Sequence, residues 1–186
     1  MRRAELRPSR SCDTARRRFQ LALLAAACTP ALGQETSALD GPRGRFDDDL
    51  ISNLEGRWKV TRQIRGTTVE NEANATWVLN HQFLQLHMKD VALPPKYEAI
   101  ILIGYVYSDK QYVAYWTDTF GAKYSGVAKG RRDGKSVEFR FDNEDGPFFN
   151  TFTWFPERNE WVSRMENQGP AASRQLFAID TYSVLK

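Results

Sequence analysis

The sequence contains the stretch Tyr97-Glu-Ala-Ile-Ile-Leu-Ile-Gly-Tyr-Val-Tyr-Ser-Asp-Lys-Gln-Tyr-Val-Ala-Tyr-Trp-Thr-Asp-Thr-Phe-Gly121. Two segments rich in β-branched and aromatic residues flank the short polar turn Ser108-Asp-Lys110. This arrangement is the pattern of a β-hairpin. Similar short segments continue on both sides of the hairpin, so the stretch predicts an all-β fold.

From Gly56 onward, apolar and polar residues alternate in short runs, as in β-strands. Turn signals rich in Gly, Pro, Asp and Asn separate these runs. Closure into an up-and-down antiparallel barrel would remove the unpaired edges of such a sheet, and a barrel of about ten strands is wide enough for an internal cavity. A β-sandwich is the alternative. The expected strands are 57–65, 72–80, 82–91, 97–107, 112–119, 123–132, 135–142, 148–155, 160–167 and 174–185.

A short helix is expected over residues 46–54, before the first strand. Phe46, Leu50 and Leu54 are spaced four apart and would share one helical face, while the aspartates at 47–49 suit a helix N-terminus. We expect this helix to pack its apolar face on the strands.

Short motifs in the region 46–186 resemble those of the bacterial calycin-like proteins of domain-of-unknown-function family 1579. This resemblance implies a lipocalin-like barrel in a family that typically has no assigned activity. The Gly-x-Trp signature is also similar to that of lipocalins, in which the tryptophan plugs the closed end of the barrel. The motifs are Leu54-Glu-Gly-Arg-Trp58, Gly104-Tyr105, and Tyr112-Val-Ala-Tyr-Trp-Thr-Asp118 with Gly121.

The sequence predicts no metal and no cofactor. His81 and His87 are its two histidines, and on one extended strand they would lie roughly 20 Å apart. The acidic runs at 47–49 and 142–145 lack the spacing of a calcium-binding loop. Nitrobindin-like haem barrels are similar relatives with a histidine ligand near the C-terminus, but no histidine follows His87 here.

No catalytic residues are predicted, since the sequence has neither a Gly-x-Ser-x-Gly elbow nor a Gly-rich phosphate loop ending in Gly-Lys-Ser/Thr. The expected site is instead an aromatic lumen with one or two polar groups. Trp116 and Asp118 share a strand face that we expect to point inward, where Arg164 or Arg140 would pair with the carboxylate. The alternative is that Trp116 packs the core and Asp118 binds backbone amides of the next turn. The predicted ligand-binding residues are Tyr105, Trp116, Asp118, Tyr124, Phe139, Trp154 and Arg164.

The fourth expected strand, 97–107, is apolar on both faces. An exposed barrel wall should be polar outside, so we expect a cover over its outward face. Either the leading helix or a second copy of the chain, in a homodimer, would supply that cover.

Residues 1–33 have the order of an export signal, in which a basic segment precedes the apolar run Leu21–Ala27 and small residues. Arg16-Arg-Arg-Phe19 resembles a twin-arginine signal, and Ala25-Ala-Ala-Cys28 resembles a lipoprotein box that would tether the protein to a membrane through Cys28. A flexible linker is expected over 34–45, followed by the barrel domain over 46–186.

The net charge of +3 comes from this leading segment. Residues 1–33 hold seven of the 26 basic and two of the 23 acidic residues, which leaves 19 basic against 21 acidic residues and a net charge of −2. The remainder therefore does not favour nucleic-acid binding. Both cysteines, Cys12 and Cys28, also lie in the leading segment, so the mature chain would contain no thiol.

Together these features predict a periplasmic or secreted, non-enzymatic barrel that binds a small hydrophobic or amphipathic ligand in its lumen. One alternative is a structural barrel that self-associates through the fourth strand. The other is an enzyme that uses an interior carboxylate such as Asp118.

Overall fold

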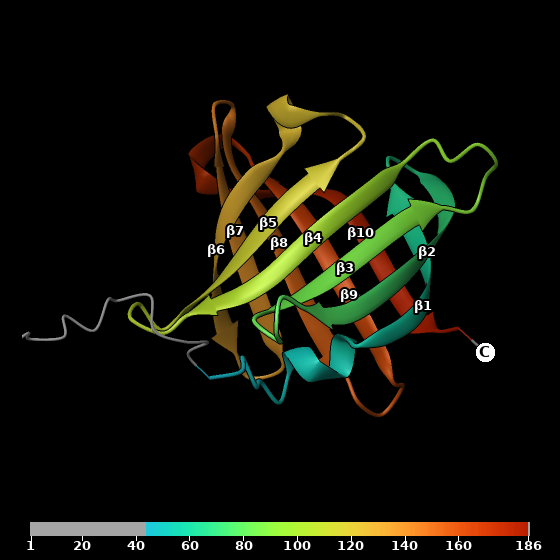
Figure 1. Ribbon diagram of the computed structural model, residues 1–186. Helices are drawn as coiled ribbons and strands as arrows, with labels where there is room; N and C mark the ends of the chain where they lie inside the picture. The colour runs from blue at the N-terminus through green and yellow to red at the C-terminus, as the bar shows by residue number, and fades with distance from the viewer. Residues whose placement is uncertain (1–43, 186) are drawn as a thin grey trace, which may run out of the picture. The chain divides into compact units, whose positions relative to one another are not determined.

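The computed structural model describes residues 44–185, which form one closed antiparallel β-barrel (Figure 1). Each strand pairs with its neighbours in the sequence, and β1 pairs with β10 to close the barrel. The predicted up-and-down barrel is therefore confirmed. The strands are β1 (Gly56–Ile64), β2 (Thr67–Val78), β3 (Phe83–Asp90), β4 (Glu98–Val106), β5 (Gln111–Asp118), β6 (Gly126–Asp133), β7 (Ser136–Asn143), β8 (Gly146–Phe155), β9 (Glu160–Gln168) and β10 (Arg174–Val184).

The observed strands differ from the predicted ones mainly at two starts. β2 begins at Thr67 because Arg65 and Gly66, which both have a positive φ, form a two-residue turn. This turn pairs Thr67 with Ile64. β6 begins only at Gly126 because the single-turn 3-10 helix η2 (Ala122–Tyr124) precedes it. A second such turn, η3 (Pro170–Ala172), precedes β10. Among residues 44–185, no helix has the length and apolar character needed to cross a bilayer.

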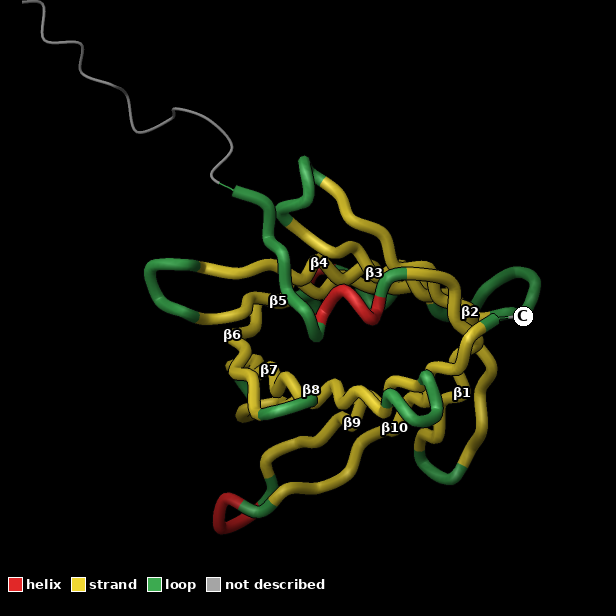
Figure 2. The backbone as a smooth tube through the Cα atoms, turned by 90° about the horizontal axis from the view of Figure 1, so that it is seen from below, coloured by secondary structure: helices red, strands yellow, loops and turns green. Residues whose placement is uncertain are grey.

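A short segment before β1 plugs one end of the barrel (Figure 2). Phe46, Leu50, Ile51 and Leu54 are all buried, and Ile51–Leu54 form the 3-10 helix η1. The expected packing is confirmed, but the expected helix over 46–54 is wrong in length. The Asp48 carboxylate accepts hydrogen bonds from the amides of Leu50 (3.0 Å) and Ile51 (2.8 Å), so a side chain rather than a preceding helical turn satisfies these donors.

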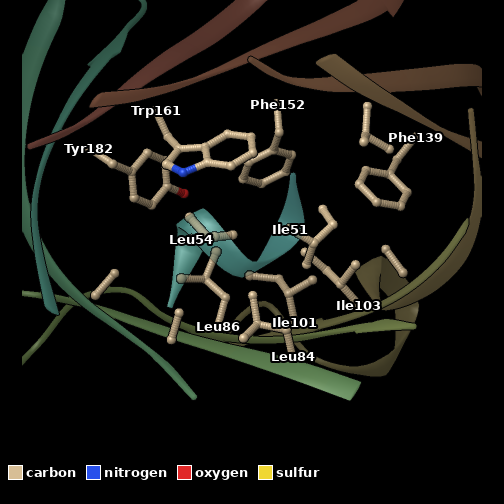
Figure 3. Packing of buried hydrophobic residues seen from close by; sticks show 14 of the residues in the cluster. Ile51, Leu54, Leu84, Leu86, Ile101, Ile103, Phe139, Phe152, Trp161 and Tyr182 are labelled. Carbon is tan, nitrogen blue, oxygen red and sulfur yellow. The ribbon is translucent and has the colours of Figure 1, made fainter. Parts of the chain in front are cut away.

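Two tryptophan side chains hold this plug in place through hydrogen bonds. Trp58 Nε1 donates to the Leu54 carbonyl at 2.8 Å, and Trp161 Nε1 donates to the Asn53 carbonyl at 3.1 Å. Figure 3 shows the apolar side chains that fill the interior around η1. The largest fully buried ones are Trp161, Tyr182, Phe139, Ile51, Leu54, Leu84, Leu86, Met88, Ile101 and Ile103. The interior around η1 is therefore packed with side chains. It does not contain the internal cavity that the number of strands predicts.

The outward face of β4 remains partly exposed. Ile100 is 41% and Val106 is 39% exposed, whereas Ile101 and Ile103 on the inward face are buried. The prediction that the leading helix covers this outward face is wrong, because η1 lies across the barrel end instead (Figure 2). Cover by a second copy stays a prediction.

Gly104 in β4 lies against the Phe83 ring, which fills the space beside it. A Cβ at this position would come within 2.6 Å of that ring.

Candidate functional site

The two ends of the barrel differ in chemistry. We call the half of the interior around η1 the closed half and the half toward the opposite end the open half. The turns that connect β1 to β2, β3 to β4, β5 to β6, β7 to β8 and β9 to β10 border the open half. Buried polar residues face inward in the open half. The apolar cluster around η1 extends into this half as well, since Phe141 belongs to it and Trp116 and Phe148 pack against it. These buried polar residues are Arg62, Asn71, Asp90, Asn150, Ser163 and Asp180.

An ion pair lies at the centre of this polar group. Arg62 Nε and Nη2 donate to the two carboxylate oxygens of Asp180, each at 2.7 Å. Asp180 is fully buried, Arg62 is 8% exposed, and the guanidinium lies 4.8 Å from the centre of the Tyr97 ring. The pair is therefore bidentate and charge-neutral as a unit.

Burial and pairing act in opposite directions on the two partners. Burial alone would lower the pKa of Arg62, but the hydrogen bonds and charge of Asp180 raise it above its ordinary value. Burial raises the pKa of the Asp180 carboxyl, and Arg62 opposes that shift. Each of the two buried groups therefore stays ionised because its partner carries the opposite charge.

Two asparagines beside this ion pair have side-chain atoms without hydrogen-bond partners among the described residues. Asn71 is 1% exposed, and neither its amide nitrogen nor its amide oxygen has a partner. Asn150 is equally buried; its oxygen accepts a hydrogen bond from Ser163 Oγ at 2.6 Å, but its nitrogen has no partner. Leaving a buried polar group unsatisfied costs roughly 1–3 kcal/mol. Such groups are few in native proteins, so these two amides stand out among the buried residues.

Aromatic residues complete the open half. Trp116 is half-buried and faces inward, and its ring lies 6.2 Å from that of Phe141, which in turn lies 6.1 Å from Phe148. Exposed apolar side chains lie on the turns at this end of the barrel, with Leu93 at 93%, Phe120 at 67% and Tyr124 at 64% exposure. This end of the barrel is thus apolar at its rim and polar deeper inside.

Trp116 and Asp118 both follow the alternative, since Trp116 packs against the apolar core and Asp118 binds a backbone amide of the next turn. Asp118 Oδ1 accepts a hydrogen bond from the amide of Phe120 at 2.9 Å, and its Oδ2 accepts one from Trp116 Nε1 at 3.2 Å. The expected pairing with Arg164 or Arg140 is wrong, since these bind Glu166 (3.0 Å) and Asp142 (2.9 Å). Asp118 therefore orients the Trp116 ring and holds the turn after β5.

The other predicted site residues are spread over the barrel. Tyr105 stacks on Phe46 at 5.8 Å and Trp154 lies 5.4 Å from Trp161, so both belong to the closed half. Phe139 is buried in the apolar core, and Arg164 is exposed on the outer surface. Of the predicted set, Trp116, Asp118 and Tyr124 lie at the end of the barrel opposite η1. A ligand-binding role for the set stays a prediction.

The structure adds four residues that the sequence reasoning missed. Arg62 faces inward on the same face as Trp58 and Val60, and Asp180 lies between inward-facing Ala178 and Tyr182. Asn71 and Asn150 likewise interrupt apolar inward faces. A polar residue on the apolar face of an alternating strand was the available signal.

The two histidines lie apart from this site. His81 stacks on Trp77 with ring centres 4.0 Å apart, and His87 contacts Glu98 at 2.5 Å. Within residues 44–185, no three His, Cys, Asp or Glu side chains form a group that could hold a metal ion.

At the closed end, an acidic pair ties the plug to the wall. Tyr112 donates a hydrogen bond to Asp48 at 2.5 Å, and Arg132 pairs with Asp49 at 2.5 Å. Burial and the neighbouring Asp48 both raise the pKa of Tyr112 above its ordinary value. Arg132 lowers the pKa of the exposed Asp49.

This raised pKa predicts a loss of stability at alkaline pH. An unfolded tyrosine ionises near pH 10, whereas folded Tyr112 keeps its proton to higher pH, so its contribution is present below pH 10 and is lost above it. The free energy of unfolding of the wild type should fall between pH 9 and pH 11. In Tyr112→Phe this fall should be smaller by about 1 kcal/mol. Urea denaturation at the two pH values measures this difference.

Tyr115→Phe is the matched control, because Tyr115 lies on the exposed outer face of the same strand. Equal losses in the wild type and in Tyr112→Phe would contradict the prediction. The loss that remains in Tyr112→Phe belongs partly to Tyr97 and Tyr182, since burial raises the pKa of each.

These features define a closed ten-stranded up-and-down β-barrel with a plugged end and a polar, aromatic open half. Among solved structures, the chain is similar to the crystal structure of Rv2717c from M. tuberculosis, with a TM-score of 0.51 and 11% sequence identity, covering 73% of this chain and 95% of that chain. With 11% sequence identity, this similarity shows a shared fold alone. No protein-family model and no curated protein matches the sequence.

Proposed function

We propose that this protein is an exported, non-enzymatic, calycin-like barrel that binds a small hydrophobic or amphipathic ligand in the open half of its lumen. The observation that carries the proposal is the position of the polar and half-buried aromatic residues, which lie away from η1, under an exposed apolar rim. Binding pockets combine an apolar wall with a few convergent polar groups in this way.

The motif resemblance to domain-of-unknown-function family 1579 supports the calycin-like part of the proposal. The periplasmic or secreted location rests on the export signal in residues 1–33. That segment, the linker up to residue 43 and Cys28 lie outside the described residues.

Trp116 supplies the central test of ligand binding. The neutral fluorescent probe N-phenyl-1-naphthylamine should bind the wild-type protein saturably, because its rings fit an apolar aromatic wall. Trp116→Ala should weaken this binding about tenfold or more, since a buried aromatic contact is worth roughly 1.5–3 kcal/mol. Fluorescence titration measures both affinities.

Tyr115→Ala is the control for this test, since Tyr115 is the neighbouring residue on the outer face and is 42% exposed. It should bind the probe as the wild type does. Absence of saturable binding to the wild type, or equal affinities of the wild type and Trp116→Ala, would contradict the proposal.

A second candidate function is self-association through the outer patch, which we define as Ile100, Leu102, Tyr115 and Val127. Leu102 pairs with Tyr115, and Tyr115 pairs with Val127, so these residues adjoin on one surface. Ile100, Tyr115 and Val127 are 41%, 42% and 57% exposed. Under this alternative the wild type sediments as a dimer and Tyr115→Ala as a monomer.

A further inference from the structure

A surface cleft of about 460 Å³ lies at the plugged end of the barrel, between the β4–β5 turn and the end of β6. β5 and β6 pair only as far as Tyr112 and Gly130, whereas β6 continues to pair with β7 up to Asp133. The two hairpins therefore part at this point, and the β4–β5 turn projects from the barrel (Figure 1). The volume of the cleft is in the range of small-molecule sites.

Two cations in this cleft have no partner. Lys110 and Arg131 line the cleft, and neither side chain makes a hydrogen bond or an ion pair with any of residues 44–185. Glu138 lies directly across from Arg131 in the β6–β7 ladder, but its carboxylate accepts hydrogen bonds from Arg174 instead, at 3.3 Å. Asp109 is the acid among the residues that line the cleft, so one carboxylate faces two free cations.

The third cation that lines the cleft is already used by the plug. Arg132 donates to both carboxylate oxygens of Asp49, at 2.5 and 3.1 Å, which neutralises its charge. Tyr112 likewise donates its hydroxyl proton to Asp48. These two side chains therefore form a fixed wall of the cleft. Its free charged donors within the described chain are the two unpartnered cations.

An aromatic surface adjoins these cations. Tyr105 lines the cleft beside Tyr112, and the two ring centres lie 5.1 Å apart with the rings at 76°. Tyr105 also stacks on Phe46 of the plug at 5.8 Å, so its ring is held in place. A flat apolar group in the cleft would contact this ring edge to face or with an offset stack.

We infer that this cleft binds a small aromatic carboxylate, with its oxygens on Arg131 and Lys110 and its ring against Tyr105. A guanidinium presents paired N–H donors that match the two oxygens of a carboxylate. The two free cations and Asp109 leave a net charge of one, which a single carboxylate balances. A neutral hydroxyl or amide would leave that charge uncompensated. This site is separate from the open half and does not depend on the ligand proposed there.

The test compares an anion with its neutral analogue. 2-Naphthoate and 2-naphthamide are titrated into the full chain by calorimetry at low ionic strength, where screening is weak. The naphthoate should bind saturably and at least tenfold more tightly than the naphthamide. Arg131→Gln and Lys110→Gln should each weaken naphthoate binding about fivefold or more, since each removes one charged contact. Asp109→Asn should strengthen it about twofold, because a like charge is removed.

Lys129→Gln is the matched control. Lys129 is an exposed cation on the outer face of β6, two residues before Arg131, and it does not line the cleft. This variant should bind the naphthoate as the wild type does. All four substituted side chains are exposed, so each variant should melt within about 2 °C of the wild type.

Three results would overturn the inference: no saturable binding of the naphthoate, equal affinities for the naphthoate and the naphthamide, or equal losses in Arg131→Gln and Lys129→Gln. The last result would mean a general attraction to the basic surface. A crystal structure with 2-naphthoate should place its carboxylate between Arg131 and Lys110, and density for it in the open half alone would also contradict the inference. None of these results bears on the proposed function, which the neutral probe and Trp116 test.

Discussion

Replacing Arg62 with methionine is expected to lower the free energy of unfolding by about 3–5 kcal/mol, because it leaves the Asp180 carboxylate buried without a partner. Methionine retains much of the apolar volume of the arginine side chain, so the loss reflects charge rather than a cavity. Urea denaturation at neutral pH measures the effect.

Two further variants separate pairing from burial. The double variant Arg62→Met with Asp180→Leu should regain most of the lost stability, because a buried ion pair can be replaced by apolar groups at little cost. Arg140→Met should cost less than about 1 kcal/mol, since the Arg140–Asp142 pair is exposed on both sides. Equal losses in Arg62→Met and Arg140→Met would show that the lumen pair is solvated.

Trp58→Ala is the second substitution with a large expected effect. Trp58 is 3% exposed and donates to the Leu54 carbonyl, so its removal opens a cavity under η1 and frees a buried acceptor. We expect a loss of about 3–5 kcal/mol of unfolding free energy. Hydrogen exchange at the Ile51 amide should also accelerate, since the plug loses its support.

Trp58→Phe distinguishes volume from hydrogen bonding. The ring remains while the carbonyl of Leu54 loses its donor, so the expected loss is about 1–3 kcal/mol. Trp116→Ala should cost less than Trp58→Ala, because Trp116 lies in the open half and is only partly buried. Unchanged exchange at Ile51 in Trp58→Ala would contradict the role of Trp58 as support for the plug.

The barrel could be predicted from the sequence because alternation and turn residues are local signals. The helix over 46–54 was predicted too long for the opposite reason. Its boundaries depend on the Asp48 cap and on the donors of Trp58 and Trp161, and the last of these lies 108 residues away from Asn53. A four-residue apolar spacing does not report such contacts.

The candidate site was only partly predictable. The inward face of β5 followed from alternation, so Trp116 was placed correctly, but its depth in the barrel was not determined. Depth depends on how neighbouring strands are staggered, which is why Tyr105 and Trp154 lie in the closed half instead. The Arg62–Asp180 pair joins residues 118 positions apart and exists only because β1 and β10 close the barrel.

The central claim is that the open half holds a small ligand, and a high-resolution crystal structure of the protein purified from its own source tests it most directly. The account predicts continuous density, longer than a chain of waters, between the Asn71 amide and the Trp116 ring. Discrete waters on Asn71 and Asn150, with Tyr97, Trp116 and Phe148 closing over them, would contradict the account.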